Sequence, residues 1–405
     1  MTADASARQG WLPRLELPMS LVGLGICGIH WIAAVFMFLS PYMKEDLGVS
    51  TTEIGVFLTI FYIASFAANV PSGTLVDMTG KRVFWQVFSL GVCALALLFV
   101  GLTGIYALIC VFIAVIGATN MLWHPAAISY LSKAYPAQRG FALSIHALGA
   151  GLGDLAAPVA AGALLTVMTW QDTAMVNSLP ALAIAAIILF GLKRTDAGKA
   201  KEKGMKGGDY FTGMKALVKD RAIVLLCMLA AFRTAAQAGL LFFMPFYLKE
   251  DLGMAPVIMG MTLAAMQVGG MVATPVAGHL SDRIGRRPIV IGGLWTTTAI
   301  IIGLTFVESQ IVFVAGIAFL GFFLYAARPV MHSWMMDLAP PNMGGSATSL
   351  MFGCQSLATI PVPVIGGLIA DNYGLLPVFY CLAGSMLVAN ILTLLVPKPP
   401  AAETA

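Results

Sequence analysis

The chain has 405 residues, of which 59% are hydrophobic and only 10% are charged, with a net charge of +4. Soluble domains carry roughly 25% charged residues, so this composition excludes a protein whose whole surface faces water. We expect most of the chain to lie in lipid and its positive charge to lie in loops, which gives no indication of nucleic-acid binding.

Apolar stretches near or above the roughly 20 residues that span a bilayer recur along the chain. The twelve stretches are residues 17–40, 53–75, 84–104, 106–131, 141–166, 174–193, 222–247, 256–277, 288–307, 310–336, 346–370 and 374–396. They lack the alternation of barrel strands, and lipid requires the backbone groups to be bonded internally. The sequence therefore predicts an all-α membrane protein with twelve transmembrane helices.

The basic residues predict the orientation of these spans, because cytoplasmic segments are enriched in Lys and Arg. With both termini cytoplasmic, 19 of the 23 basic residues lie inside and two, Lys44 and Lys249, lie in outside loops. The expected organisation is a cytoplasmic tail (1–16), a six-helix bundle (17–193), a cytoplasmic linker (194–221), a second six-helix bundle (222–397) and a cytoplasmic tail (398–405).

The two predicted bundles are copies of one half-molecule. The sequence Lys-Glu-Asp-Leu-Gly stands at residues 44–48 and again at 249–253, an offset of 205 positions. The same offset relates Gly73, Asp77, Gly80 and Arg82 to Gly278, Asp282, Gly285 and Arg287. A long internal repeat in a very apolar chain indicates a transporter with its site between the halves.

A repeated motif follows spans 2 and 8, and we expect it to form a loop. Its copies read Gly73-Thr-Leu-Val-Asp77-Met-Thr-Gly80-Lys81-Arg82 and Gly278-His-Leu-Ser-Asp282-Arg283-Ile-Gly285-Arg286-Arg287. Gly permits a sharp turn and close helix approach, Asp accepts hydrogen bonds at a helix N-terminus, and the basic residues pair with carboxylates or phosphates.

With this motif, twelve spans and a duplication, the whole chain resembles the major facilitator superfamily, although Met78 departs from the motif. The resemblance implies two pseudo-symmetric six-helix bundles, alternating access and a gating role for the motif. Asp77 and Asp282 would clasp helix ends of the opposite half in the outward-facing state. Their expected partners are Gly344, Gly345, Ser346, Arg139 and Gly140.

Span 5 resembles a degenerate form of the small-residue pattern of antiporters in the superfamily, which favours export over uptake. The matching positions are Ser144, Gly153, Ala157, Pro158, Ala161 and Gly162. Small residues also allow close helix packing whatever the direction of transport.

Ionisable residues inside the spans mark the expected site, because each costs roughly 2.5–3.5 kcal/mol at the centre of a membrane helix. They are His30, His124, His146, Asp154, Arg233, Arg328 and His332. Five of the seven lie on spans 1, 4, 7 and 10, which the resemblance implies as the cavity-lining spans. Spacing of four residues places polar pairs on one helix face, namely Asn120 with His124, Arg233 with Gln237, and Arg328 with His332.

Two permanent positive charges and one candidate carboxylate in this cavity predict a small anionic substrate. Arg keeps its proton, and its planar fork suits a carboxylate, phosphate or phosphonate. The expected substrate-binding residues are Arg233, Arg328, His332, His124, Asn120, Gln237 and His30. Structural alternatives stay open: Arg233 pairs with Asp154, and His30 and His146 serve helix packing.

Protons are the expected coupling ion, because His titrates near neutral pH and burial would bring Asp154 there too. Proton coupling is assigned to Asp154 and His146. The sequence gives no pattern for a sodium, metal or cofactor site, although facilitated diffusion without coupling stays open. We expect a monomer in a bacterial-type cytoplasmic membrane.

Several branches of the superfamily fit these residues. Trp123-His124-Pro125, Arg139-Gly140-Phe141-Ala142 and span 5 resemble the fosmidomycin-resistance branch, and branches that move mono- and dicarboxylates also place Arg in spans 4, 7 or 10. An exporter of neutral or amphipathic drugs and a metal-chelate transporter are the alternatives.

Two functions outside transport agree less well with these residues. An enzyme is not expected, because the sequence gives no nucleophile–base pair or metal cluster near one surface. A transport-inactive receptor or scaffold would be expected to lose the cavity charges and gating motifs that this chain keeps.

Overall fold

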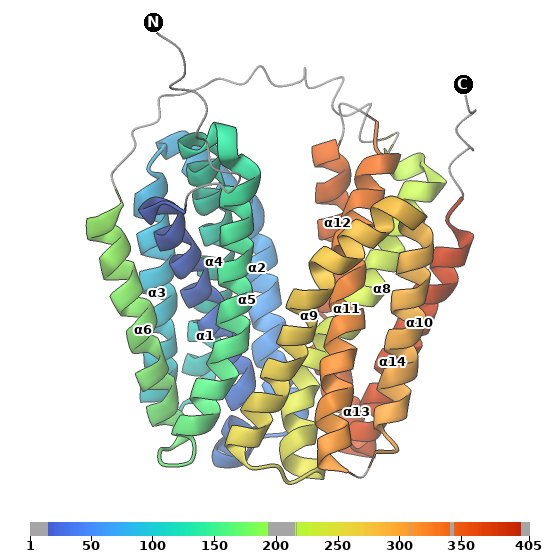
Figure 1. Ribbon diagram of the computed structural model, residues 1–405. Helices are drawn as coiled ribbons and strands as arrows, with labels where there is room; N and C mark the ends of the chain where they lie inside the picture. Colours follow the sequence, from blue (N-terminus) through green and yellow to red (C-terminus); the bar gives the residue numbers. More distant parts are fainter. Residues whose placement is uncertain (1–14, 193–214, 216, 308, 341–343, 398–405) are drawn as a thin grey trace, which may run out of the picture.

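The computed structural model describes residues 15–192, 215, 217–307, 309–340 and 344–397. Twelve segments of this part of the chain are helical, long and apolar enough to cross a membrane, which confirms the predicted number of spans. The chain is therefore a multi-pass membrane protein. Its helices form two bundles that stand side by side, α1 to α6 in one and α8 to α14 in the other (Figure 1).

The first bundle extends from α1 to α6. Its helices are α1 (Leu17–Leu47), α2 (Thr51–Thr79), α3 (Arg82–Leu102), α4 (Tyr106–Ala134), α5 (Arg139–Leu164) and α6 (Trp170–Gly191). Helix α1 ends at Gly48, whose φ of 62° is in the left-handed region that glycine adopts without strain. Helix α2 starts with a capping box in which Ser50 and Glu53 bind each other's backbone amides.

The second bundle repeats this order with one difference. Its helices are α8 (Arg221–Phe246), α9 (Pro256–Ile284), α10 (Arg286–Leu304), α11 (Gln310–Leu338), α12 (Gly344–Thr359), α13 (Val362–Tyr373) and α14 (Leu375–Leu395), with a π-helical turn at Tyr247–Asp251. The span predicted over 346–370 is present, at Ala347–Tyr373, but its helix is not continuous. That span breaks between α12 and α13, where Pro361 and Pro363 lack the amide hydrogens that a helix needs.

Much of the repeated motif is helical, although the sequence predicted a loop. Gly73 lies inside α2 and Gly278 lies inside α9, so the sharp turn expected at these residues was wrong. The turns fall at Gly80 and Gly285, with φ of 66° and 93°. These two positions need glycine, because other residues rarely adopt such backbone conformations.

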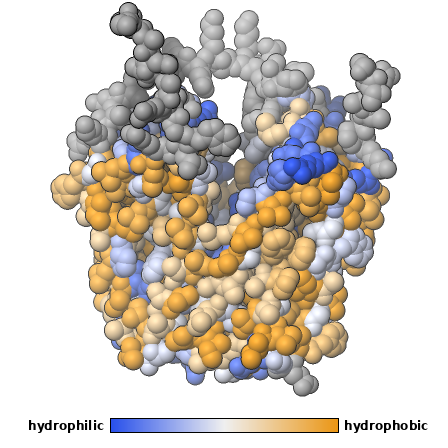
Figure 2. Space-filling view, viewed as in Figure 1, coloured by the Kyte–Doolittle hydropathy of each residue, from blue (hydrophilic) through white to orange (hydrophobic). Residues whose placement is uncertain are grey.

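The side surface of the molecule is mostly apolar, as expected for a protein surrounded by lipid (Figure 2). At one end the surface is hollowed between the bundles, and a hydrophilic patch covers the adjacent end of the second bundle. Helix α1 begins and α14 ends at this same end, where the ribbons of the two bundles diverge (Figure 1). We call it the open end and the opposite one the closed end.

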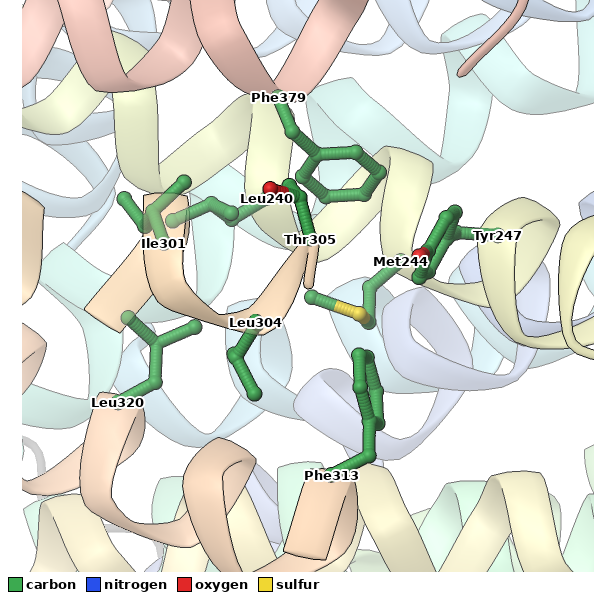
Figure 3. A pocket seen from close by; sticks show the side chains of 9 residues that line it. All are labelled: Leu240, Met244, Tyr247, Ile301, Leu304, Thr305, Phe313, Leu320 and Phe379. Atoms are coloured by element: carbon green, nitrogen blue, oxygen red, sulfur yellow. The ribbon is translucent and has the colours of Figure 1, made fainter. Parts of the chain in front are cut away.

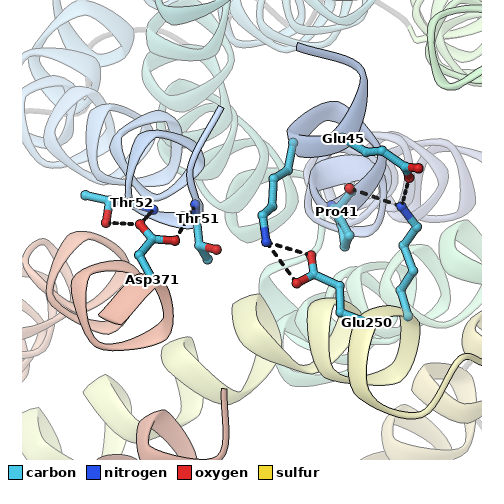
Figure 4. Close-up of polar contacts among 8 residues, drawn as sticks. Pro41, Glu45, Thr51, Thr52, Glu250 and Asp371 are labelled. Atoms are coloured by element: carbon cyan, nitrogen blue, oxygen red, sulfur yellow. Dashed lines mark hydrogen bonds and ion pairs between the residues drawn. The ribbon is translucent and has the colours of Figure 1, made fainter. Parts of the chain in front are cut away.

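Reciprocal ion pairs join the bundles at the closed end (Figure 4). Lys44 Nζ lies 2.8 Å from a carboxylate oxygen of Glu250, and Lys249 pairs with Glu45. These residues belong to the two copies of Lys-Glu-Asp-Leu-Gly, so one repeated sequence supplies both partners of both pairs. Lys44 and Lys249 lie in the last turn of α1 and in the π-helical turn, and not in loops as the sequence suggested.

Glycines bring the helix backbones into direct contact beside these ion pairs. A side chain at Gly55 would collide with the carbonyl of Pro363, and one at Gly260 would collide with the carbonyl of Pro158. The 205-residue offset relates Gly55 to Gly260 and Pro158 to Pro363. The contact of α2 with α13 and that of α5 with α9 are therefore two copies of one interface.

Asp371 breaks this symmetry. Its carboxylate accepts the amides of Thr51 at 2.8 Å and Thr52 at 2.9 Å, so it caps the N-terminus of α2 from the other bundle (Figure 4). The corresponding residue of the first half is Thr166, and the corresponding helix begins at Pro256, which has no amide hydrogen. One half alone supplies this cap.

The ion pair at the closed end gives a first prediction. Lys44→Glu would set two acidic groups opposite each other, and amide hydrogen exchange across residues 44–55 should rise roughly fivefold, since a partly exposed pair contributes at most about 1 kcal/mol. The double variant Lys44→Glu/Glu250→Lys should return to the wild-type exchange rate. Equal exchange in the single and double variants would contradict a role for the pair.

Candidate functional site: the cavity between the bundles

A cavity lies between the bundles in two adjoining lobes of about 280 and 300 Å³. Both lobes have Phe61, Asn120, Gln237, Leu241 and Arg328 in their walls, so they lie next to each other. Small-molecule sites usually measure roughly 300–1,000 Å³, so each lobe is at the lower end of that range and suits a small solute.

We call the first lobe the histidine lobe, because His30 of α1 and Asp154 of α5 form part of its wall. His30 Nδ1 lies 3.1 Å from each carboxylate oxygen of Asp154. Close packing of α5 on α1 makes this contact possible, since a side chain at Gly153 would collide with the carbonyl of Cys27. The alternative pairing of Asp154 with Arg233 was wrong.

Two further histidines continue from His30 into the first bundle. The ring of His124 lies 6.4 Å from that of His30 and 6.0 Å from that of His146, measured between centroids. His146 is buried, and its Nε2 accepts a hydrogen bond from Trp123 Nε1 at 3.3 Å. The sequence-predicted residues of spans 1, 4 and 5 thus come together in one polar row.

We call the second lobe the arginine lobe, because Arg233 and Arg328 both lie in its wall. Arg233 of α8 is 1% exposed and donates from Nη2 to the carbonyl of Leu324 in α11. Its buried Nε has no hydrogen-bond partner in the described part of the chain. Leu324 lies one helical turn before Arg328, whose side chain is accessible and forms part of the wall of both lobes.

The other predicted residues lie at different depths. Asn120 and Gln237 are in the walls of both lobes, whereas His124 and His332 are in the wall of neither. The ring of His332 lies 5.0 Å from that of Phe352, which is part of the arginine lobe. His332 therefore lies behind the wall.

Sequence reasoning missed the uncharged polar residues of the cavity. They are Gln267 and Tyr325 in the histidine lobe, and Tyr62, Ser65, Asn69, Thr234, Gln355, Ser356 and Thr359 in the arginine lobe. Neutral polar residues occur in many places along these spans, so their presence alone gave no signal. Their arrangement around one space is a property of the fold.

The charges of the cavity are unbalanced. Among its described wall residues, Asp154 is the only carboxylate, and it already binds His30. Two guanidinium groups, those of Arg233 and Arg328, face this single acid. Buried charges in membrane proteins are normally paired, so the arginine lobe is suited to an anion from outside the chain.

A second, apolar pocket within the second bundle does not suit a solute (Figure 3). Its free volume is about 10 Å³, which is room for about one water molecule. Its lining includes Leu240, Met244, Phe313 and Phe379, and it offers little polar surface to hold even that water.

At the open end, the basic residues of the repeated motif bind within their own bundle. Arg286 pairs with Asp282 and lies 3.0 Å from Asp337, which confirms the predicted pairing of motif bases with carboxylates for this residue. Arg287 donates to the carbonyl of Leu394, and Arg82 donates to Ser129 Oγ at 2.7 Å.

The remaining charged residues of the motif are at the surface of the open end. Asp77, Asp282 and Arg283 have exposed side chains, and Lys81 precedes the first residue of α3. The clasp of Asp77 and Asp282 onto the opposite bundle stays a prediction, since the bundles diverge at this end (Figure 1).

Comparison with known proteins identifies the family. The sequence model of the Major Facilitator Superfamily matches residues 22–266 and 226–405. The chain belongs to the major facilitator superfamily. The fold agrees: a bacterial homologue of the human lysosomal transporter Spinster, solved in an inward-facing and unoccupied conformation, superposes with a TM-score of 0.81 at 15% identity. The match covers 96% of this chain and 100% of that one.

Relatives within the superfamily are named for different solutes. The probable sulfoacetate transporter SauU of Cupriavidus necator is 24% identical over 95% of this chain and 95% of its own. The multidrug resistance protein MdtG of Klebsiella pneumoniae is 22% identical over 93% of each chain. This chain is thus a transporter-family protein of the kind that handles small solutes.

The unpaired charge of Arg233 gives a second prediction. Arg233→Met removes a buried guanidinium together with its hydrogen bond to Leu324, two effects that offset each other. We expect a melting temperature within about 3 °C of the wild type in detergent, measured by intrinsic fluorescence. A fall of more than about 10 °C would instead identify Arg233 as a structural residue of the bundle.

Proposed function

We propose that this protein transports a small organic anion across a bacterial cytoplasmic membrane by alternating access. In this proposal both termini and the open end face the cytoplasm, in agreement with the positive-inside rule. The ion pairs and glycine contacts of the closed end then separate the cavity from the outside. The protein moves its solute without changing it, as its transporter relatives would suggest.

The observation that carries this proposal is the excess of two guanidinium groups over one paired carboxylate in the cavity wall. Arg328 is the proposed central ligand, because its side chain is accessible and belongs to both lobes. A planar guanidinium binds a carboxylate or sulfonate through parallel charge-assisted hydrogen bonds. Asn120 and Gln237 supply further polar contacts from the opposite bundles.

Export of lipophilic drugs is the competing function, and the relationship to MdtG is its support. A neutral or cationic drug would leave both guanidinium groups of the cavity without a counter-charge, which is costly away from water. The relationship to SauU and the charge of the cavity agree with each other, and we therefore favour the anion.

We further propose proton coupling through the pair of His30 and Asp154. Histidine changes its charge near neutral pH, and Asp154 lies in direct contact with it. The pair is in the same cavity as Arg328, so a proton taken up there changes the field that the anion meets. His124 and His146 continue the polar row away from the cavity.

Removal of the central ligand tests the anion proposal. Arg328→Gln should lower the uptake of labelled sulfoacetate into proteoliposomes by roughly 30-fold or more, because the anion loses its main charged partner. Arg221→Gln, at the exposed start of α8, is the matched control and should transport at the wild-type rate. Unchanged uptake by the Arg328 variant would overturn the assignment.

A carboxylate-to-amide change tests the coupling. Asp154→Asn should abolish uptake driven by a pH gradient while preserving the exchange of labelled for unlabelled solute in the absence of a gradient. Asp172→Asn, at the exposed cap of α6, is the control and should keep both activities. If gradient-driven uptake persists in the Asp154 variant, the proton must be carried by a histidine instead.

A further inference from the structure

We propose that the arginine lobe recognises a dianion, with one acidic group bound by Arg328 and the other directed at Arg233. This inference rests on the proposed transport of an anion and specifies its chemical class. It assigns different roles to Arg233 and Arg328, which the sequence analysis placed in one group of substrate-binding residues.

Both arginines are attached to α11, Arg328 as one of its residues and Arg233 through a hydrogen bond. Arg233 reaches from α8 and is fixed by its hydrogen bond to the carbonyl of Leu324. Leu324 precedes Arg328 by four residues, about 6 Å along the axis of α11. Both arginines belong to the wall of the same lobe. Two guanidinium groups in the wall of one small lobe suit two acidic groups that belong to the same small molecule.

Charge compensation also requires two negative groups. The described wall of the arginine lobe contains two guanidinium groups and no carboxylate. Asp154 cannot serve, because it lies in the other lobe and binds His30. A monoanion at Arg328 would leave the buried charge of Arg233 without a partner, and a single unpaired buried charge is strongly unfavourable. A dianion would neutralise both.

Neutral donors in the same lobe suit the oxygen atoms of such a ligand. Gln355, Ser356 and Thr359 of α12 lie in the wall, as does Thr234 of α8. Thr234 Oγ1 is buried and has no hydrogen-bond partner in the described part of the chain, as is also true of Arg233 Nε. Unpaired buried polar groups are rare in folded proteins and call for an explanation. A ligand rich in oxygen atoms would bring hydrogen-bond acceptors close to both groups.

The experiment compares dianions with monoanions of the same shape. Purified protein at neutral pH is titrated with succinate, sulfoacetate and tartrate, and with the monoamide of each, in which one carboxylate becomes a carboxamide. Binding is measured by calorimetry and by the thermal stabilisation of the protein. In the wild type we expect at least one dianion to bind roughly 30-fold or more tightly than its monoamide, since one charged contact is lost.

Variants of Arg233 assign that difference to one residue. Arg233→Gln should bring the ratio of the two dissociation constants to within about threefold of one, because its charge is gone. Arg233→Lys keeps the positive charge without the planar fork, so it should retain a clear preference for the dianion. The expected folding of both variants is checked by their melting temperatures before titration.

The outcomes separate this inference from the proposed function. Equal binding of dianions and monoamides by the wild type would overturn two-point recognition and leave anion transport standing. An unchanged preference in Arg233→Gln would overturn the part assigned to Arg233. If no anion of the series binds the wild type, both the inference and the proposed function fail.

Discussion

The fold depends on one contact that the two bundles make at the closed end. Lys44 and Lys249 each bind a glutamate of the opposite bundle, and Gly55 and Gly260 let the helix backbones touch beside them. Because this interface joins the bundles at one end, they can diverge at the other and leave a cavity between them (Figure 1). The duplication supplies each of these contacts twice, so a single half-sequence specifies a self-complementary interface.

The two halves differ in the charged residues that they contribute to the cavity. The first bundle contributes His30 and Asp154 to the cavity, whereas the second contributes Arg233 and Arg328. The acid is satisfied within its own bundle, whereas the buried Nε of Arg233 has no hydrogen-bond partner in the described part of the chain. Unpaired charges are costly in a membrane, so the presence of two arginines on one wall supports the proposal of an anionic solute.

The length and the apolar character of the stretches predicted all twelve spans, because lipid imposes the same demand on every one of them. The same argument selected seven ionisable residues in the spans, of which His30, Asp154, Arg233 and Arg328 are in the cavity wall. The pairings were not predictable. Whether Asp154 meets His30 or Arg233 depends on how closely α5 packs on α1, and that distance is set in three dimensions.

Local backbone chemistry explains the errors. Gly73 and Gly278 were expected to turn the chain, yet a helix tolerates glycine, and the turn forms seven residues later at Gly80 and Gly285. Hydropathy did not predict the break at Pro361 within the apolar run over 346–370, because it does not depend on whether a residue has an amide hydrogen.

The most direct test of the central claim is to locate a bound anion. A crystal of the protein soaked with bromosuccinate gives an anomalous signal at the bromine atom, which marks the position of the ligand. Our account predicts a single peak in the arginine lobe, with the carboxylates within hydrogen-bond distance of Arg328 and directed at Arg233. A peak confined to the histidine lobe, or no peak in the cavity at saturating ligand, would contradict it.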